Sequence, residues 1–503
     1  MTKVKAERIL AILVLLFAVV FAFQVKTEAA PEENALNIAG MELPTAKLGK
    51  IRYGSEVDKT RIVCDLSGEA DYTVTMQESP PRLIIDLQNT EITGVPPIIP
   101  LNDTLATQVI IVPGQGQRVK IVIDLAYESQ YHVFKLASPS RLVIDLLKSY
   151  EQKSERLLDS GLRYISSRKN TKDSSLAVHI LDFDLSSNSL KLEHVLAKDE
   201  IVGLETVTSM AIRTNAVAAV NGTYFAKNGE LLGLVVHNDQ IVQSPVPKRT
   251  AFAVKNSGEI MMDQVNYSGK VEGPDGISCE IKSINRWRGP DEVVVYTSAF
   301  GKTTQTNQYG KEYTVIGGKV AQIGYGNAAI PVDGYVISSH GESMALLNPI
   351  KVGDQLTIRE QLEPGWTEVR LAVGAGPQLV KDGNVFLTTK SEGFGGDVAG
   401  GRAPRTALGI TPNQHLLLVV VDGRQPGYSD GMTLLELAKL MHELGANEAM
   451  NLDGGGSAEL VIEGQVVNRP SDGKERPIGD ALVLVPVKQN NIVTITPVAS
   501  VNH

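Results

Sequence analysis

The sequence predicts an α+β protein, with an all-β sandwich domain first and a larger, β-rich mixed α/β domain after it. Three observations support this prediction. One segment repeats at a constant offset, short strands between Gly and Asn turns dominate after residue 161, and a strong helix signal appears only late, at 433–445. With 503 residues, 43% of them apolar, the chain is long enough to build several hydrophobic cores.

The first 30 residues have the layout of an export signal. Basic residues precede an uncharged apolar run over 9–23, and the small residues Ala29 and Ala30 follow it. This run is shorter than the roughly 20 residues of a membrane-spanning helix. We expect residues 1–30 to act as a cleaved signal peptide or as an uncleaved membrane anchor. The protein is therefore expected outside the cytoplasm, secreted or associated with the cell envelope, with membrane contact only through an uncleaved N-terminus.

Composition excludes several classes of function. The formal net charge of −9 argues against nucleic-acid binding, because Lys and Arg supply most of the affinity for phosphate backbones. An anionic substrate must then be held by a few local cations. The two cysteines, Cys64 and Cys279, are too few for a disulfide framework or a Cys-rich zinc site. One bridge between them and two separate thiols both remain open.

An internal repeat predicts the first domain. Residues 61–87 and 120–146 align at one offset, as in Asp65 and Asp124, where 124 − 65 = 59. Both copies alternate apolar and polar residues and place a Ser-Pro turn before the motif Arg-Leu-(Ile/Val)-Ile-Asp-Leu, a pattern typical of paired strands. Two such units predict a small β-sandwich over 45–148.

The repeated motif resembles the AMIN domain, a targeting module of exported bacterial amidases and secretins. By this resemblance, residues 45–148 bind peptidoglycan or another envelope glycan. A structural role, in which Arg82 and Arg141 of the two copies pair with neighbouring Asp side chains, is the alternative for these two residues. The polar segment 149–160 is predicted to be a linker, and the second domain is predicted to span 161–488.

Within the second domain, short strands without a long helix predict an inserted β-subdomain at about 280–370. The late helix is predicted from a capping box formed by Thr433 and Glu436, an apolar face, and Gly445 after its last turn. The buried strand before this helix ends at Asp422, and the strand after it leads to Asp453. Such a strand–helix–strand unit predicts parallel strands whose carboxyl ends share one edge, which would bring both carboxylates together.

Two glycine-rich segments are candidates for anion binding. Backbone N–H groups of Gly454, Gly455 and Gly456 can approach an anion closely. The segment GFGGDVAGGRAPR carries Arg402 and Arg405, whose guanidinium groups suit the recognition of phosphate oxygens. A flexible surface loop is the alternative for this second segment.

Several motifs occur in the order seen in one enzyme family: NGTYF at 221–225, ExxG at 230–233, RTAxG at 405–409, DG at 422–423, ExA at 436–438, NLDGGGS at 451–457 and PSD at 470–472. Together they resemble the phosphodiester glycosidase family, which includes N-acetylglucosamine-1-phosphodiester α-N-acetylglucosaminidase. The resemblance covers about 210–487. It implies hydrolysis of glycosyl-1-phosphodiesters, with a sugar phosphodiester as the substrate.

The chemistry of such a reaction assigns roles to these residues. The departing phosphomonoester has a second pKa near 6, so stabilising charge matters more than strong general-acid help. We predict Asp453 as nucleophile or base, Asp422 as second carboxylate or ligand of a sugar hydroxyl, and Arg405 as charge stabiliser. A retaining or an inverting outcome remains open. Predicted substrate-binding residues are Asn221, Gly222, Glu230, Arg402, Gly454, Gly455, Gly456, Ser457 and Asp472. Outside Asp453 and Arg405, each has the alternative of a turn residue that bonds its own backbone.

The sequence requires no cofactor, although a Ca²⁺ site built from Asp422, Asp453 or Asp397 stays open. Residues 427–431 satisfy the GxSxG motif of serine hydrolases, but Ser429 lies too far beyond its strand for that chemistry. The expected function is therefore an exported hydrolase of glycosyl-1-phosphodiester bonds of the N-acetylglucosamine type, in envelope glycans or exopolysaccharide. A non-catalytic protein that binds envelope glycans or assists polysaccharide assembly is the alternative.

Overall fold

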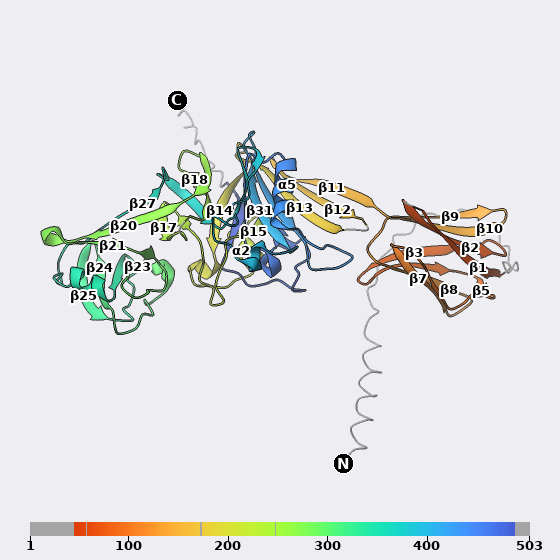
Figure 1. The fold of residues 1–503 in the computed structure, drawn as a ribbon, viewed down its shortest axis with the longest axis horizontal. Coiled ribbons are helices and arrows are strands. Elements are labelled where there is room, and N and C mark those ends of the chain that lie inside the picture. The colour runs from red at the N-terminus through yellow and green to blue at the C-terminus, as the bar shows by residue number, and fades with distance from the viewer. Residues whose placement is uncertain (1–44, 57, 172–173, 247, 488–503) are drawn as a thin grey trace, which may run out of the picture. The chain divides into compact units, whose positions relative to one another are not determined.

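The computed structural model describes residues 45–487, except residues 57, 172, 173 and 247 (Figure 1). The predicted export segment, residues 1–30, lies outside the described residues. Within the described residues, no helix is long and apolar enough to cross a membrane. The expected β-rich character is confirmed, since strands outnumber helices throughout this part of the chain.

Residues 45–148, the first domain, form two five-stranded sheets around one hydrophobic core that contains Leu48, Ile85, Ile121 and Ile144. The first sheet has the order β5 (Thr90–Ile92), β1 (Ala46–Ser55), β2 (Lys59–Leu66), β10 (Ser140–Leu147) and β9 (Tyr131–Ala137). The second has the order β3 (Tyr72–Glu78), β4 (Pro81–Leu87), β8 (Val119–Leu125), β7 (Ala106–Pro113) and β6 (Ile98–Pro100).

The sequence repeat explains this strand order. Strands β2 to β4 belong to the first copy and β8 to β10 to the second, yet β2 pairs with β10 and β8 pairs with β4. Each sheet is thus completed by strands from both copies. Matched side chains meet across the same boundary, because Arg82 Nε donates to Asp124 Oδ1 at 2.7 Å and Arg141 Nε lies 3.8 Å from Asp65 Oδ1. Both arginines thus pair with neighbouring Asp side chains, as the structural alternative predicts.

The prediction of a linker over 149–160 is wrong. Residues of this segment form β11 (Tyr150–Asp159), which pairs antiparallel with β12 (Leu162–Asn170). Most side chains of β11 are exposed because it is the edge strand of its sheet, so its composition resembles that of a linker. The backbone hydrogen bonds that hold it leave no signal in the composition.

Residues 149–487, the second domain, are built on two sheets that enclose a shared core. The core contains Phe183, Val220, Leu408, Leu460 and Leu482. The large sheet has the order β11, β12, β13 (Ser175–Asp184), β32 (His415–Val421), β31 (Arg405–Ile410), β33 (Glu448–Asn451), β29 (Gln378–Lys381) and β30 (Asn384–Val385). The small sheet has the order β14 (Leu190–Leu196), β36 (Asp480–Pro486), β15 (Ala218–Asn221), β34 (Leu460–Ile462) and β35 (Gln465–Val466).

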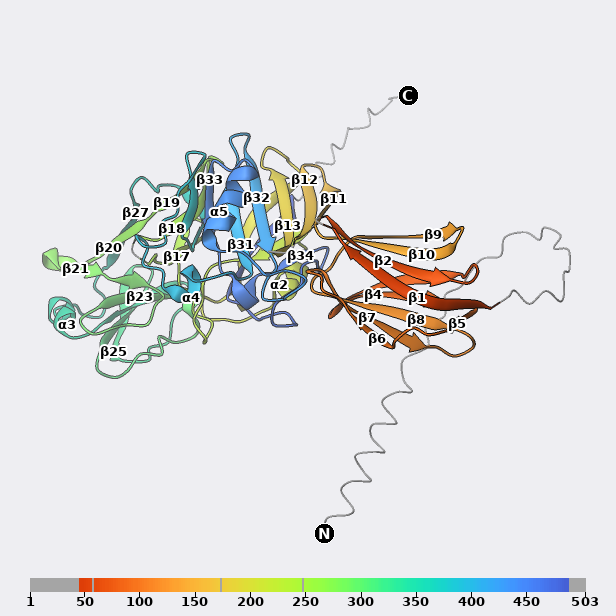
Figure 2. The ribbon, with the colours of Figure 1, turned by 45° about the vertical axis from the view of Figure 1, so that its right-hand side comes forward.

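Helices cover the outer faces of these two sheets. On the large sheet, α5 (Leu434–Glu443) packs Leu437, Ala438 and Met441 against a core that includes Val419 (Figure 2). On the small sheet, α2 (Val207–Thr214) packs Met210 in the same way. Four layers result, with a helix on each outside and two sheets between. The predicted capping box of Thr433 and Glu436 is present at the start of α5.

The predicted strand–helix–strand unit is formed by β32, α5 and β33. Between the two strands lies β31, which is antiparallel to both. Consequently β32 and β33 are parallel to each other, as predicted, and their carboxyl ends lie at one edge of the large sheet. The start of β31 lies at this edge too, which brings Arg405 to the residues that follow β33.

A third sheet carries the inserted subdomain. Its order is β17 (Gln240–Gln243), β16 (Val235–His237), β28 (Val369–Gly374), β18 (Thr250–Lys255) and β19 (Ile260–Gln264). The insertion between β19 and β28 starts at Asn266, earlier than the predicted residue 280. It contains β20 (Asn266–Glu272), β21 (Ser278–Ile281), β22 (Ser283–Ile284), β23 (Val293–Thr297), β24 (Lys311–Ile316), β25 (Lys319–Tyr325), β26 (Gly334–Ser339), the short helix α3 (Glu342–Leu347) and β27 (Thr357–Glu363).

The two cysteines lie in separate cores. Cys64 belongs to the core of the first domain and Cys279 to that of the insertion, and neither forms a disulfide. Burial raises the pKa of the Cys64 thiol to about 12, so it is an unreactive core residue. Of the two alternatives left open by the sequence, the structure has two separate thiols.

Candidate functional site

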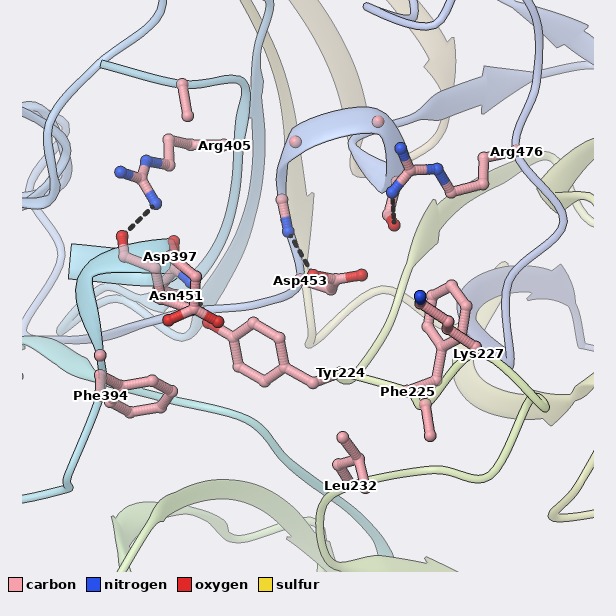
Figure 3. Close-up of a pocket in the computed structure, with 18 of the residues that line it drawn as sticks. Tyr224, Phe225, Lys227, Leu232, Phe394, Asp397, Arg405, Asn451, Asp453 and Arg476 are labelled. Carbon is pink, nitrogen blue, oxygen red and sulfur yellow. Dashed lines mark hydrogen bonds between the residues drawn. The ribbon is translucent and has the colours of Figure 1, made fainter. Parts of the chain in front are cut away.

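A cavity of about 720 Å³ opens where several chain segments meet at the edge that carries Asp453 (Figure 3). Its size falls in the usual range for small-molecule sites. The segments come from the turn after β15, the region of α4 (Gly396–Ala399), the start of β31 and the turn after β33. Its lining includes Tyr224, Phe225, Lys227, Leu232, Arg249, Phe394, Asp397, Arg405, Arg424, Asn451, Asp453, Gly454, Gly455, Gly456, Ser457 and Arg476.

The end of β15 and the residue after it hold both backbone polar groups of Asp453. Asn221 Nδ2 donates to the Asp453 carbonyl at 2.7 Å, and Asp453 N–H donates to the Gly222 carbonyl at 3.1 Å. The carboxylate accepts the Gly454 N–H at 2.9 Å. Asn221 and Gly222 therefore position Asp453 rather than line the cavity themselves.

The environment of Asp453 shifts its acidity. Enclosure by the cavity walls raises the pKa of this carboxyl to about 6, because removal from water disfavours the charged form. Hydrogen bonds from Ser457 and Gly454, together with the positive charge of Arg476, oppose this shift in pKa. The nearby carboxylate of Asp480 adds to it. A carboxyl with a pKa near 6 can hold or release a proton at neutral pH.

The glycine turn after Asp453 lets two guanidinium groups come close to its backbone. A Cβ atom at Gly456 would lie 2.0 Å from Arg476 Nη2, and a Cβ at Gly455 would lie 3.2 Å from the guanidinium nitrogens of Arg424. Gly455 also has φ of +63°, a conformation that favours glycine. Arg476 is held in place by Asp472, whose Oδ2 lies 2.6 Å from Arg476 Nη2. Asp472 thus acts on the cavity through Arg476.

Arg405 lies in the cavity wall and organises the loop before β31. Arg405 is labelled in Figure 3. It is only 3% exposed, and its guanidinium donates to the carbonyls of Met432 at 2.9 Å, Val398 at 3.0 Å and Gly401 at 3.2 Å. Burial and repulsion by Arg424 lower the pKa of Arg405. Two of these carbonyls belong to the loop before β31 and the third to the segment before α5. Arg405 therefore fixes the shape of the cavity as well as its charge.

Tyr224 and Asn451 form part of the cavity wall. The Tyr224 hydroxyl donates to the Gly376 carbonyl at 2.9 Å and accepts from Asn451 Nδ2 at 2.7 Å. The Tyr224 ring lies 5.7 Å from the ring of Phe394, and the guanidinium of Arg249 lies 4.4 Å from the Phe394 ring centre. Burial raises the pKa of Tyr224 strongly, so this hydroxyl stays protonated.

The prediction that Asp422 and Asp453 share one site is wrong. Asp422 is 1% exposed and does not line the cavity. Its carboxylate accepts hydrogen bonds from Asn468 Nδ2 at 2.9 Å, from Tyr428 Oη at 2.9 Å and from Arg469 N at 3.0 Å. With these bonds Asp422 joins three segments of the fold and has no surface for a substrate. The parallel strands place both residues at one edge, but their side chains serve different purposes.

Other predicted residues also lie apart from the cavity. Arg402 is exposed, and its Nη2 bonds Glu436 Oε1 at 2.5 Å. Glu230 lines a separate cavity of about 510 Å³, together with Arg286. Ser429 is fully buried and bonds the Asp422 carbonyl at 2.7 Å, which excludes it as an exposed nucleophile.

The three aspartates considered for a Ca²⁺ site lie in different surroundings. Asp397 and Asp453 line the cavity, but Asp422 does not. In the part of the chain that the structure describes, no group of three His, Cys, Asp or Glu side chains is placed to hold a metal ion.

Sequence reasoning missed several cationic side chains of the cavity. Arg476 follows the PSD motif by a few residues, so that motif was a partial signal for it. Lys227, Arg249 and Arg424 lie in separate turns without a recognisable pattern, and only the fold brings them together. Tyr224 belongs to the NGTYF motif, but a tyrosine at this position does not by itself indicate a role in binding or catalysis.

Comparison with known families agrees with both resemblances. Residues 309–485 match the family model described as phosphodiester glycosidase, and residues 50–131 match that of the AMIN domain. The first match covers about a third of the chain and contains Arg405, Asp453 and the glycine turn. Both resemblances inferred from the motifs are therefore confirmed.

Individual relatives match shorter parts of the chain. An 81-residue segment, 16% of this chain, is 38% identical to 12% of the SPbeta prophage-derived uncharacterized protein YomE of Bacillus subtilis (strain 168). A 154-residue segment, 28% of this chain, is 29% identical to 29% of the N-acetylglucosamine-1-phosphodiester alpha-N-acetylglucosaminidase of Mus musculus. The chain thus matches less than a third of the length of either relative.

The fold itself has a relative among solved structures. The crystal structure of a hypothetical protein from Synechocystis resembles this chain with a TM-score of 0.62 at 23% sequence identity. The likeness covers 88% of this chain and 81% of that chain. At this identity it concerns the fold alone.

Proposed function

We propose that this chain, which contains a phosphodiester glycosidase segment, hydrolyses glycosyl-1-phosphodiester bonds of the N-acetylglucosamine-1-phosphodiester type, in envelope glycans or exopolysaccharide. One observation carries the proposal. Asp453, a carboxyl with a pKa of about 6, lies in a cavity whose other charged lining groups are mostly cationic. A phosphodiester supplies the negative charge that such a cavity attracts. Its sugar supplies the anomeric carbon, which a carboxylate can attack directly, or which water can attack while the carboxylate takes its proton.

The reaction breaks the bond between the anomeric carbon and the phosphate oxygen. The electron pair of this bond leaves with the phosphate, and the oxygen of water replaces it on the sugar. Because the leaving phosphomonoester is weakly basic, a strong general acid is not needed. The cations of the cavity stabilise the charge that grows on the departing phosphate. Asp453 then acts in its ionised form, as the base that takes the proton of water or as the nucleophile.

Asp397 is the other carboxylate among the cavity-lining residues. It is exposed and comes from α4, on the loop that Arg405 anchors through the Val398 carbonyl. Glycosidases commonly use two carboxylates on either side of the scissile bond. We assign Asp397, in place of Asp422, as the candidate for the second role.

The assignment of Asp453 gives the activity a defined pH dependence. The purified protein is expected to release free N-acetylglucosamine from its 1-(methyl phosphate) ester. Below pH 6 Asp453 is protonated and cannot act as base or nucleophile, so kcat/KM should rise with pH and level off above an apparent pKa of about 6. The measurement is the initial rate of free-sugar release between about pH 4 and pH 8.

Two outcomes would contradict this assignment. Release of no sugar at any pH would favour the alternative of a non-catalytic protein that binds envelope glycans or assists polysaccharide assembly. A rate that falls as the pH rises through 6 would instead assign Asp453 the role of a general acid.

The first domain supports a role at the cell envelope. Residues 50–131 match the AMIN domain, and the domain has its own core and completes both of its sheets from its own strands. We propose that residues 45–148 bind peptidoglycan or a related glycan, and that the protein works outside the cytoplasm.

The isolated first domain is therefore expected to sediment with purified peptidoglycan. A fragment over 150–487, which keeps β11 in its sheet, serves as the matched control and should stay in the supernatant. Recovery of both fragments in the supernatant, with circular dichroism showing that the first is folded, would contradict the binding role.

A further inference from the structure

Asp480, at the start of β36, is a fully buried carboxylate that does not line the cavity of Asp453. Its Oδ1 accepts the Thr223 N–H at 2.9 Å, and its carbonyl accepts the Gly222 N–H at 3.1 Å. The Gly222 carbonyl in turn accepts the Asp453 N–H at 3.1 Å. A single residue, Gly222, therefore connects the backbone of Asp480 to the backbone of Asp453.

Gly222 also leaves room for the carboxylate of Asp480. A Cβ atom at Gly222 would lie 2.5 Å from Asp480 Oδ2, which is too close for any larger residue at this position. The carboxylate thus lies directly against the residue that holds Asp453. Burial is the main cause that raises the pKa of Asp453, and the negative charge of Asp480 raises it further.

His194, on β14, is the ion-pair partner of Asp480. Its Nε2 lies 2.8 Å from Asp480 Oδ2, and neither side chain is more than 1% exposed. Its other ring nitrogen, Nδ1, is buried and has no hydrogen-bond partner among the described residues. A proton on Nδ1 would be a buried donor without an acceptor, so the hydrogen bonds assign the single ring proton to Nε2. The neutral ring donates this proton to Asp480 and stabilises its charge without cancelling it.

Other charged groups surround Asp453 and Asp480 but do not pair with Asp480. On the side of Asp453, the charge of Arg476 opposes the rise in the pKa of that carboxyl. The same cavity is lined by Lys227, Arg249, Asp397, Arg405 and Arg424. Among the described residues, the ion pairs of Asp480 include His194 alone. The charge of Asp480 therefore reaches Asp453 without a cation bonded to it.

A second cavity, of about 630 Å³, lies on the side of His194. Its titratable and charged lining groups are Lys191, Glu193, His194, Asp199, Arg213 and His237. The rings of His194 and His237 lie 6.4 Å apart, and burial together with His194 lowers the pKa of His237. Glu193 and Asp199 are paired with cations of their own. None of these groups replaces His194 as the partner of Asp480.

We propose that Asp480 is a positioning residue for Asp453, that His194 holds it in its ionised form, and that its charge determines the pH range in which Asp453 serves the reaction. The inference rests on the proposed function and deepens it, because it names the residue pair that regulates the same site. Asp480 acts through the Gly222 backbone and through its charge. An ionised neighbour makes Asp453 keep its proton to a higher pH and makes the ionised Asp453 a stronger base.

The variant Asp480→Asn tests this role. It keeps the shape of the side chain and an oxygen that can accept the Thr223 N–H, but it removes the charge. The acid limb of kcat/KM for release of N-acetylglucosamine from its 1-(methyl phosphate) ester should move to lower pH by about half a unit or more. The plateau should fall about two- to threefold, because Asp453 becomes a weaker base. At about pH 5 the variant should therefore match or exceed the unchanged protein. Loss of activity at every pH, with the limb in place, would overturn the inference.

Two variants of His194 separate its bond to Asp480 from its size. His194→Phe removes the donor and keeps a ring, so that the unpartnered buried carboxylate of Asp480 takes up a proton. Its acid limb should move as in Asp480→Asn. His194→Gln keeps an N–H donor and should keep the limb of the unchanged protein. The matched control, Asp199→Asn, removes an exposed carboxylate from the second cavity and should not move the limb. Equal limbs in the Phe and Gln variants would contradict the role of His194.

Infrared titration distinguishes this inference from the function on which it rests. The difference between a protein and its matching Asp453→Asn variant isolates the C=O band of protonated Asp453. Its loss with rising pH gives the pKa without turnover. The midpoint should lie at about 6 in the unchanged protein and lower in Asp480→Asn. Circular dichroism checks each fold, and His194→Phe serves the same test if Asp480→Asn does not fold.

The two results of this titration have different meanings. An unchanged midpoint in the folded variant would overturn the inference and leave the glycosidase function intact. A lowered midpoint, without sugar release by the unchanged protein at any pH, would support the control of Asp453 by Asp480 and contradict the glycosidase function alone.

Discussion

Asp453→Asn is expected to lower kcat for sugar release by about 10²- to 10⁴-fold, the usual contribution of a catalytic base. The amide has the shape of the carboxyl and keeps an oxygen that can accept the Gly454 N–H, so the turn should remain in place. It cannot take a proton from water or attack the anomeric carbon. The measurement is single-turnover and steady-state release of N-acetylglucosamine, with the fold checked by circular dichroism.

The matched control is Asp333→Asn, which removes an exposed carboxylate from the inserted subdomain. This variant should keep the kcat of the unchanged protein. The residual activity of Asp453→Asn should also lose the apparent pKa near 6. If Asp453→Asn retained a large part of the activity, the proposed chemistry would need another carboxylate, and Asp397 would be the first to test.

Asp422→Asn is expected to destabilise the protein rather than stop the reaction. The amide would present its NH₂ group to donors that now bind a carboxylate oxygen, namely Asn468 Nδ2, Tyr428 Oη and the Arg469 N–H. Because these groups are buried, the loss of charge-assisted bonds should lower the free energy of unfolding by about 3 kcal/mol. Urea denaturation followed by circular dichroism measures this change.

The folded fraction of Asp422→Asn should hydrolyse the substrate with kcat close to that of the unchanged protein. The two substitutions then differ clearly. Asp453→Asn lowers activity and keeps the stability of the fold, whereas Asp422→Asn lowers stability and keeps the activity of the folded protein. A large loss of kcat at unchanged stability would restore the sequence-based assignment of Asp422 to the chemistry.

The sequence predicted the parts of the fold that local patterns determine. The capping box at Thr433 and Glu436 and the repeat of Asp65 and Asp124 are local signals, and both lead to the observed elements. The segment 149–160 was misread because an edge strand exposes most of its side chains and resembles a linker in composition. Its place in a sheet depends on hydrogen bonds to β12, which composition does not encode.

The residues of the candidate site were predictable from the sequence only where they belong to a short motif of adjacent residues. Asp453, the glycine turn and Arg405 stand in recognisable motifs and do line the cavity. Asp422 shares the correct sheet edge, but strand direction does not determine which way its side chain turns. Lys227, Arg249 and Arg424 come from distant turns, so only the packing of the sheets brings them to one cavity.

The exchange of strands between the two copies of the first domain determines when each of its sheets can form during synthesis. When the first copy leaves the ribosome, β2 and β4 have no inner neighbours, because these neighbours are β10 and β8 of the second copy. The second sheet cannot close until the chain has been made to Leu125, and the first sheet cannot close until it has been made to Leu147. The early part of the domain can pair β1 with β2 and β3 with β4, but Ile62, Leu83 and Ile85 stay uncovered until the strands of the second copy have been made.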